Sequence, residues 1–104
     1  MTRVQIARYA GAVGDFNPIH VDEEFARAAG MPSVIAHGPL TVTLAIDALI
    51  SQVGARTLRR FDARLRAPVL PGDTLTVVPS GDGVEIRTEA GKVVATATVV
   101  VENP

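Results

Sequence analysis

The chain contains no cysteine, which excludes disulfide bonds and thiolate metal sites and makes a reducing cytoplasm its expected location. Aromatic residues make up 4% of the sequence, too few for the stacked-ring surfaces that bind single-stranded nucleic acid. Neither sign of charge dominates, and a net charge of -1 argues against nucleic acid or an acidic membrane as a partner. The most apolar stretch, 34–50, is interrupted by Pro39 and Asp47, so no membrane span is expected.

What the chain has in quantity is apolar side chains. They make up 47% of 104 residues, against 20% charged residues, which is enough to build a packed core. A single core typically serves roughly 100–150 residues. Residues 1–104 are therefore predicted to form one domain.

The first half of the chain carries helix signals. Thr2 and Gln5 have capping-box spacing, and Gly14 is a plausible stop, which predicts a helix between them. Pro18 disfavours helical geometry at the residue before it, so residues 15–21 are predicted to form a loop. A short helix capped by Asp22 and ended by Gly30 should follow.

The second half changes period. Residues 39–53 are apolar almost all round, so a helix there should be covered on most sides. Residues 57–67 alternate between apolar and charged side chains, and further strands are predicted at 74–79, 84–89 and 92–101, joined by short turns typical of antiparallel hairpins. The economical arrangement is an α+β domain in which a curved antiparallel sheet wraps around a long central apolar helix.

The chemistry is concentrated in Gly14-Asp-Phe-Asn-Pro-Ile-His20 and in Ala36-His-Gly-Pro-Leu40. These motifs resemble the signature of the MaoC-like, (R)-specific enoyl-CoA hydratase and hydroxyacyl-thioester dehydratase family, over nearly the whole chain. The resemblance implies a hot-dog fold and the reversible hydration of trans-2-enoyl thioesters to (R)-3-hydroxyacyl thioesters. It implies Asp15 and His20 as the catalytic pair, with Asp15 the base toward water.

Physical reasoning supports these roles. Adding water across a Cα=Cβ bond needs a base for the water, an acid for the α-carbon and donors for the thioester oxygen. A carboxylate and an imidazole on one short loop can hold the same water, and Pro18 stiffens that loop. Asn17 is expected to pin the loop by hydrogen bonds. Alone, Asp15 could form an Asx turn and His20 could be a structural histidine.

The second motif should hold the substrate. The resemblance assigns the thioester carbonyl to the start of the central helix, where Gly38 offers an N–H to an oxyanion. Many relatives have another residue where Pro39 stands, and proline donates no hydrogen bond. Thr41 or Thr43 could supply a hydroxyl. His37 belongs to the predicted substrate-binding set, although anchoring of the helix start is favoured over catalysis for it.

Half of the basic residues lie within 11 positions. They form either an ordinary solvated strand face or a docking surface for coenzyme A phosphates or an acidic acyl-carrier protein. Strand alternation places three of the five outside. The five are Arg56, Arg59, Arg60, Arg64 and Arg66, of which Arg60, Arg64 and Arg66 are the candidate phosphate contacts.

Two other functions remain open. Asp47 could be the central-helix carboxylate of a hot-dog acyl-thioesterase, or an exposed or paired carboxylate. The chain could also be a non-catalytic acyl-binding or assembly subunit of a heteromeric dehydratase, although such a subunit need not keep Asp15 and His20.

Family members usually carry a strand before the first helix, and here the helix begins almost at Met1. A missing strand leaves a sheet edge that should be paired or covered. The resemblance implies a homodimer, or a heterodimer with a sister hot-dog subunit. No cofactor is expected beyond the coenzyme A or phosphopantetheine of the substrate. With two histidines and no cysteine, no metal is expected either.

Overall fold

The computed structural model describes residues 1–53 and 57–102 of the chain. Their contacts divide the chain into two compact units, each described by itself below. The first unit comprises Met1–Thr41 and Pro68–Asp73, and the second comprises Val42–Ala67 and Thr74–Pro104. That residues 1–104 form one domain stays a prediction, and Arg56 lies outside the described residues.

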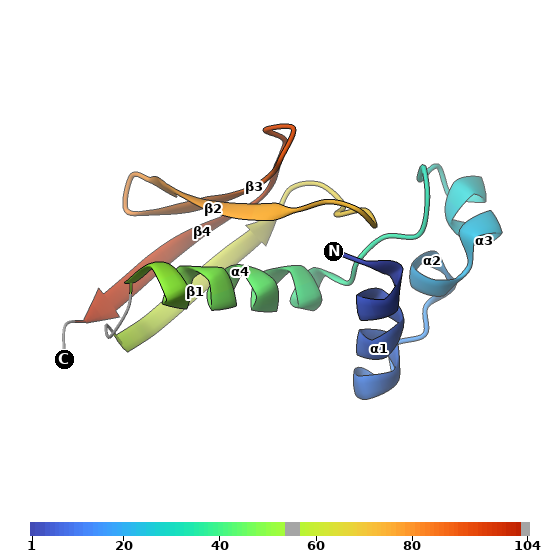
Figure 1. Ribbon diagram of the computed structural model, residues 1–104, viewed down its shortest axis with the longest axis horizontal. Helices are drawn as coiled ribbons and strands as arrows, with labels where there is room; N and C mark the ends of the chain where they lie inside the picture. The colour runs from blue at the N-terminus through green and yellow to red at the C-terminus, as the bar shows by residue number, and fades with distance from the viewer. Residues whose placement is uncertain (54–56, 103–104) are drawn as a thin grey trace. The chain divides into compact units, whose positions relative to one another are not determined.

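The first unit is helical (Figure 1). Its elements are α1 (Arg3–Val13), α2 (Pro18–Val21), α3 (Glu23–Ala28) and the first residues of α4 (Gly38–Val53). The predicted capping box is confirmed, because Thr2 Oγ1 accepts a hydrogen bond from the Gln5 N–H at 3.0 Å and Gln5 Oε1 accepts one from the Thr2 N–H at 2.9 Å. Gly14 ends α1 in the left-handed conformation, with φ of 73°, as predicted.

The prediction that residues 15–21 form a loop is wrong in its second half. Pro18 occupies the first position of α2, where its missing N–H costs nothing. Asn17 has non-helical backbone angles, as expected before proline, and its Oδ1 accepts a hydrogen bond from the Ile19 N–H at 3.1 Å. The proline that argued against a helix instead starts one.

Glu23 connects three segments of the first unit. The predicted cap of α3 is confirmed at Asp22, whose side chain accepts from the Phe25 N–H. In the next residue, Glu23 Oε1 accepts a hydrogen bond from the Val34 N–H at 2.9 Å, and Oε2 accepts one from Arg3 at 2.7 Å. These bonds, first the Val34 N–H and then the Arg3 guanidinium, hold the pKa of Glu23 below its usual value. Glu23 thus ties α1, α3 and the segment before α4 together.

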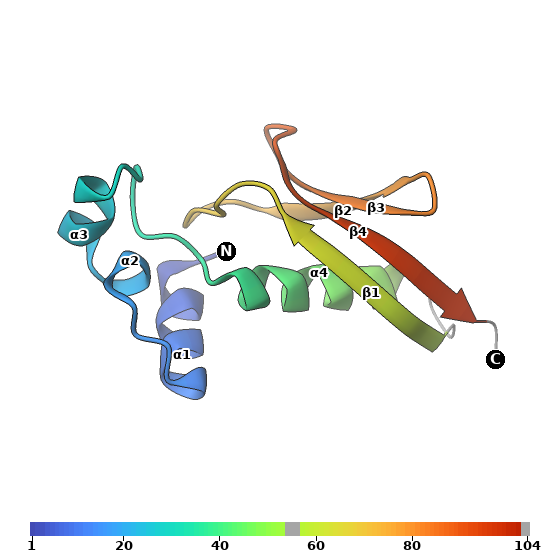
Figure 2. The same cartoon turned by 180° about the vertical axis from the view of Figure 1, so that it is seen from behind.

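The second unit contains a four-stranded antiparallel sheet with the order β1-β4-β3-β2 and most of α4 (Figures 1 and 2). Its strands are β1 (Thr57–Leu65), β2 (Leu75–Ser80), β3 (Gly83–Thr88) and β4 (Val93–Glu102). The four predicted strands and the two hairpins that join β2 to β3 and β3 to β4 are confirmed.

Strand register gives the sheet one apolar face. Val77 pairs with Ile86, Ile86 with Ala95, and Val84 with Ala97, and all five are buried. The alternation predicted for β1 is confirmed for its arginines, which are exposed, although Leu65 at its end is 55% exposed. Glycine is required at position 83, the first residue of β3, because a Cβ there would lie 1.9 Å from the Ala97 carbonyl oxygen.

The prediction that α4 is covered on most sides is confirmed for part of the helix only. Leu40, Ala45 and Leu49 are buried, whereas Asp47 and Ile50 are exposed. The sheet of the second unit is open and lies on one side of the helix, so the other side keeps its exposed residues (Figure 2). Within the described ranges, no helix has the length and apolar character needed to cross a membrane.

Replacing Ile86 should destabilise the sheet strongly. Ile86 is 1% exposed at the centre of the apolar face, so Ile86→Ala should lower the free energy of unfolding by about 2–5 kcal/mol. Urea denaturation followed by circular dichroism measures this loss. The matched control is Val100→Ala on β4, where a 46% exposed side chain should cost about 1 kcal/mol or less. Equal losses in the two variants would contradict the assigned core.

Glu23→Gln should weaken the fold at neutral pH and reduce its sensitivity to acid. Because the folded-state pKa of Glu23 is lowered, its contribution is present above its unfolded pKa of about 4.5 and is lost as the pH falls through the folded value. Urea midpoints measured from about pH 7 down to about pH 3 should converge for the two proteins at the acid end. A constant difference across that range would contradict the assignment.

Candidate active site

Three side chains from separate segments of the first unit converge. Asp15 follows α1, His20 lies in α2, and His37 lies immediately before α4. One carboxylate oxygen of Asp15, one ring nitrogen of His20 and one ring nitrogen of His37 lie within 4.8 Å of one another. The structure thus brings together the two predicted catalytic residues and one of the predicted substrate-binding residues.

His20 is oriented by a backbone carbonyl. Its Nδ1 lies 2.7 Å from the carbonyl oxygen of Ile35, which can only accept, so Nδ1 carries the proton and donates. The neutral ring then has its lone pair on Nε2. The ring is partly exposed. His20 therefore presents to the site a nitrogen that can accept or return a proton.

Asp15 is held by its backbone and by one carboxylate oxygen. Oδ1 accepts a hydrogen bond from the Asn17 N–H at 3.3 Å, and the Asp15 carbonyl oxygen lies 3.0 Å from His37 Nε2. The contact between Asp15 Oδ1 and the Asn17 N–H is an Asx turn, which is the structural role that the sequence allowed for Asp15. The residue is nevertheless exposed, and its carboxylate can still bind water.

His37 is buried beneath the pair. It is 1% exposed, and its ring stacks on that of His20 with centroids 3.7 Å apart and an interplanar angle of 22°. The Tyr9 ring lies against it at 4.8 Å and 56°. A buried ring that donates to the Asp15 backbone fits the anchoring role favoured for this residue. Contact between His37 and substrate stays a prediction.

Gly38, the predicted oxyanion donor, lies at the start of α4, and its role stays a prediction. The Thr41 N–H donates to the His37 carbonyl at 3.1 Å, which closes the first turn of the helix. Gly38 is the first residue of α4, and its N–H is among those without a partner inside the helix. Thr43 is an exposed residue of α4 in the second unit, and its role stays a prediction.

The predicted phosphate-docking arginines lie in the second unit and are exposed. Arg60 forms an ion pair with Asp62, as the solvated-face interpretation expects. Arg64 and Arg66 line an open groove of about 620 Å³ across the sheet. The same groove contains three carboxylates, those of Asp62, Asp82 and Glu85. It is therefore not a purely cationic surface.

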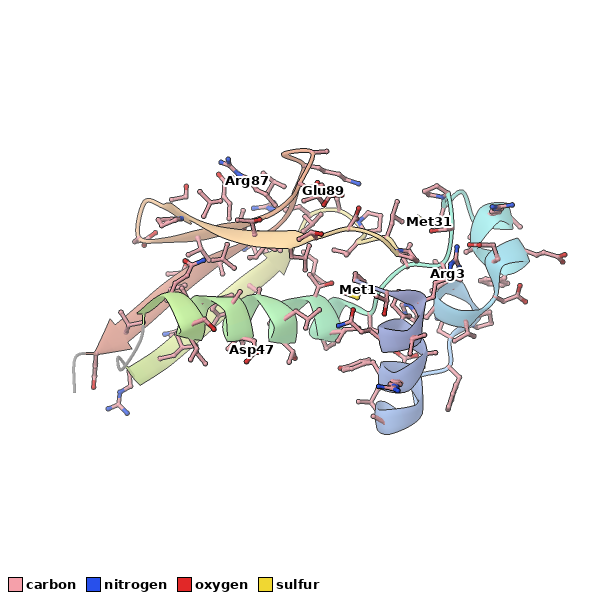
Figure 3. The ribbon with its side chains drawn as sticks, in the orientation of Figure 1. Met1, Arg3, Met31, Asp47, Arg87 and Glu89 are labelled. Atoms are coloured by element: carbon pink, nitrogen blue, oxygen red, sulfur yellow. The ribbon has the colours of Figure 1, made fainter. Side chains whose placement is uncertain are left out.

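Asp47, the carboxylate of the thioesterase alternative, is exposed on α4. Figure 3 shows it on the side of the helix away from the sheet. The cluster of Asp15, His20 and His37 belongs to the other unit. No observation within the described residues favours Asp47 as a reactive group.

The three clustered side chains could in principle hold a metal ion, but the histidine geometry disfavours one. Each ring uses one nitrogen on a backbone carbonyl, which leaves His20 Nε2 and His37 Nδ1 as possible ligands. The two ring planes are nearly parallel, at 22° and 3.7 Å apart, and each lone pair lies in the plane of its ring. The two lone pairs therefore do not meet at one point close to the rings, as ligands of a tetrahedral metal site must. The arrangement suits an acid–base pair better than a metal centre.

Three contacts that shape the site were not expected from sequence. The Ile35 carbonyl that orients His20 is a backbone group and has no signature in a residue pattern. The Glu23 carboxylate accepts from the N–H of Val34, one position before Ile35, although the two residues lie far apart in the sequence. The Tyr9 ring lies against that of His37, and no motif in the sequence pointed to this contact.

The chain resembles known proteins in both sequence and structure. It is 36% identical to peroxisomal multifunctional enzyme type 2 of Mus musculus over 93 residues, which are 86% of the chain and 12% of that protein. It is 40% identical to 3-hydroxyacyl-thioester dehydratase Y of Mycobacterium tuberculosis over 85 residues, which are 78% of the chain and 27% of that protein. The chain thus spans well under a third of the length of either relative.

The chain is similar in structure to the R-hydratase PhaJ1 from Pseudomonas aeruginosa, solved in the unliganded form, with a TM-score of 0.81 and 25% identity. The match covers 100% of this chain and 75% of the PhaJ1 chain. This likeness confirms the predicted α+β hot-dog fold, here with a sheet that is not closed. The model of the MaoC like domain family matches residues 1–103. The chain therefore belongs to the MaoC-like dehydratase family.

Proposed function

We propose that the chain catalyses the reversible hydration of trans-2-enoyl thioesters to (R)-3-hydroxyacyl thioesters, with Asp15 and His20 activating the water. Family membership and the names of the relatives support a hydratase or dehydratase reaction. The chain's own residues must supply the acid–base chemistry. The coenzyme A or phosphopantetheine group enters as part of the substrate, and no further cofactor is proposed.

One observation carries the proposal: the Asp15 carboxylate and the His20 imidazole lie side by side, and each is fixed through one atom while another is left for water. Asp15 is fixed through Oδ1 and His20 through Nδ1. We propose that the atoms that remain, Asp15 Oδ2 and His20 Nε2, bind the reacting water molecule together. This is the geometry that a general base and a proton carrier require.

The proposed arrangement assigns each proton transfer of the reaction to a group. Asp15 accepts a proton from the water as the water oxygen bonds to C3, and this same proton is afterwards delivered to C2. His20 orients the water through Nε2 and helps to move that proton. Negative charge develops on the thioester oxygen, and the N–H of Gly38 at the start of α4 is the proposed donor to it. Pro39 has no N–H, so the next residue cannot share this role.

Asp15→Asn should abolish hydration while leaving the fold intact. An amide cannot accept the proton from water, so kcat/KM should fall by about 10²- to 10⁴-fold. The assay follows the loss of enoyl absorbance with crotonyl-CoA and with a longer 2-enoyl-CoA. The matched control is Asp22→Asn, which makes the same change at a helix cap where asparagine is equally suitable.

Other outcomes of this assay separate the alternatives. Unchanged hydration in Asp15→Asn would contradict the proposed base. Release of free thiol without hydration, lost in Asp47→Asn, would identify a thioesterase. A wild-type protein that is silent in both assays but binds a sister subunit would support the assembly-subunit interpretation.

We also propose that the chain works as a dimer, built with a second copy or with a sister hot-dog subunit. Among the strands that the structure describes, β1 pairs with β4 alone and β2 with β3 alone, so each has an unpaired edge. Unpaired edges are usually covered in a native assembly. Light scattering after size exclusion should give twice the mass of one chain. A monomer at every concentration would contradict the homodimer.

A further inference from the structure

His37 touches both members of the proposed catalytic pair by different means. Its Nε2 lies 3.0 Å from the Asp15 carbonyl oxygen, and its ring stacks on the His20 ring at 3.7 Å. It is buried, with 1% of its surface exposed, and the Tyr9 ring covers part of it.

The hydrogen bond fixes the tautomer of His37. A carbonyl oxygen only accepts, so Nε2 must carry a proton and donate. In the neutral ring this leaves the lone pair on Nδ1, which is buried and has no partner among the described residues. A ring that shuttled protons to the substrate would need an exposed nitrogen. His37 has one nitrogen engaged by the backbone and the other enclosed.

We propose that His37 is a positioning residue, which sets the spacing between Asp15 and His20 and takes no part in proton transfer itself. This inference rests on the proposed function. Its donated hydrogen bond holds the backbone of the base, and its flat ring sets the plane of the His20 imidazole. The neighbouring carbonyl of Ile35 holds Nδ1 of that same imidazole, so one short segment before α4 positions both reacting side chains.

Two substitutions separate the two contacts. His37→Gln keeps an N–H that can reach the Asp15 carbonyl but removes the ring, whereas His37→Phe keeps a ring that can stack but removes the donor. Misplacement of reacting groups by about 1 Å can cost roughly 10²-fold in rate, so each variant should lose up to that factor in kcat with little change in KM. Far-ultraviolet circular dichroism and urea unfolding confirm that each variant is folded.

The pH profile distinguishes positioning from proton transfer. Asp15 and His20 remain in both variants, so both limbs of the kcat profile should persist at reduced height, whereas His20→Gln should lose one limb. Loss of a limb in His37→Gln would overturn the proposal and make His37 a proton carrier. Wild-type kcat in both His37 variants would overturn it by showing that the ring is only core packing.

A second readout does not depend on activity. The chain has two histidines, so imidazole nitrogen NMR resolves His20 and His37 as the only two ring systems. The expected tautomers are Nδ1–H for His20 and Nε2–H for His37, and the Nδ1–H form of His37 would overturn the proposal. A wild-type protein with these tautomers that hydrates no enoyl thioester would instead reject the proposed function, and with it any role of His37 in that reaction.

Discussion

The first unit depends on how the segment from Ser33 to His37 satisfies its backbone hydrogen bonds. The segment is largely buried and belongs to no helix or sheet, so each polar backbone group needs a separate partner. The partners come from all around the unit: Glu23 binds the Val34 N–H, the Ile19 carbonyl binds the Ile35 N–H, and the Val69 carbonyl binds the Ala36 N–H. An unpaired buried group would cost about 1–3 kcal/mol, so these contacts hold the helices together.

The proposed active site depends on the same set of backbone hydrogen bonds. The carbonyl oxygen of Ile35 accepts a hydrogen bond from His20 Nδ1. This bond selects the tautomer of His20 in which the lone pair is on Nε2. Two residues later, His37 donates to the Asp15 carbonyl and stacks on His20. The groups that order the segment are thus the groups that place Asp15 and His20, the proposed acid–base pair.

Structural and functional interpretations of these residues are therefore not exclusive. Asp15 does form an Asx turn with Asn17, and His37 is a buried anchor, as their structural interpretations expect. Asp15 nevertheless keeps an exposed carboxylate beside the imidazole of His20. Holding one oxygen through the turn lowers the freedom of the other, which favours a defined position for bound water.

Sequence patterns predicted the local features: the capping box of Thr2 and Gln5, the stop at Gly14, the cap at Asp22, the four strands and the motif that contains Asp15 and His20. Each depends on neighbours along the chain or on strand period, which a sequence displays directly. Tertiary structure decided the turn of helix at Pro18, the open side of α4 around Asp47, and the partners of Val34 and Ile35. The backbone groups of Val34 and Ile35 find their partners in segments distant in sequence, and every residue carries such backbone groups, so no residue pattern records these contacts. The helix at Pro18 is held by local bonds instead, and the exposed side of α4 follows from the open sheet.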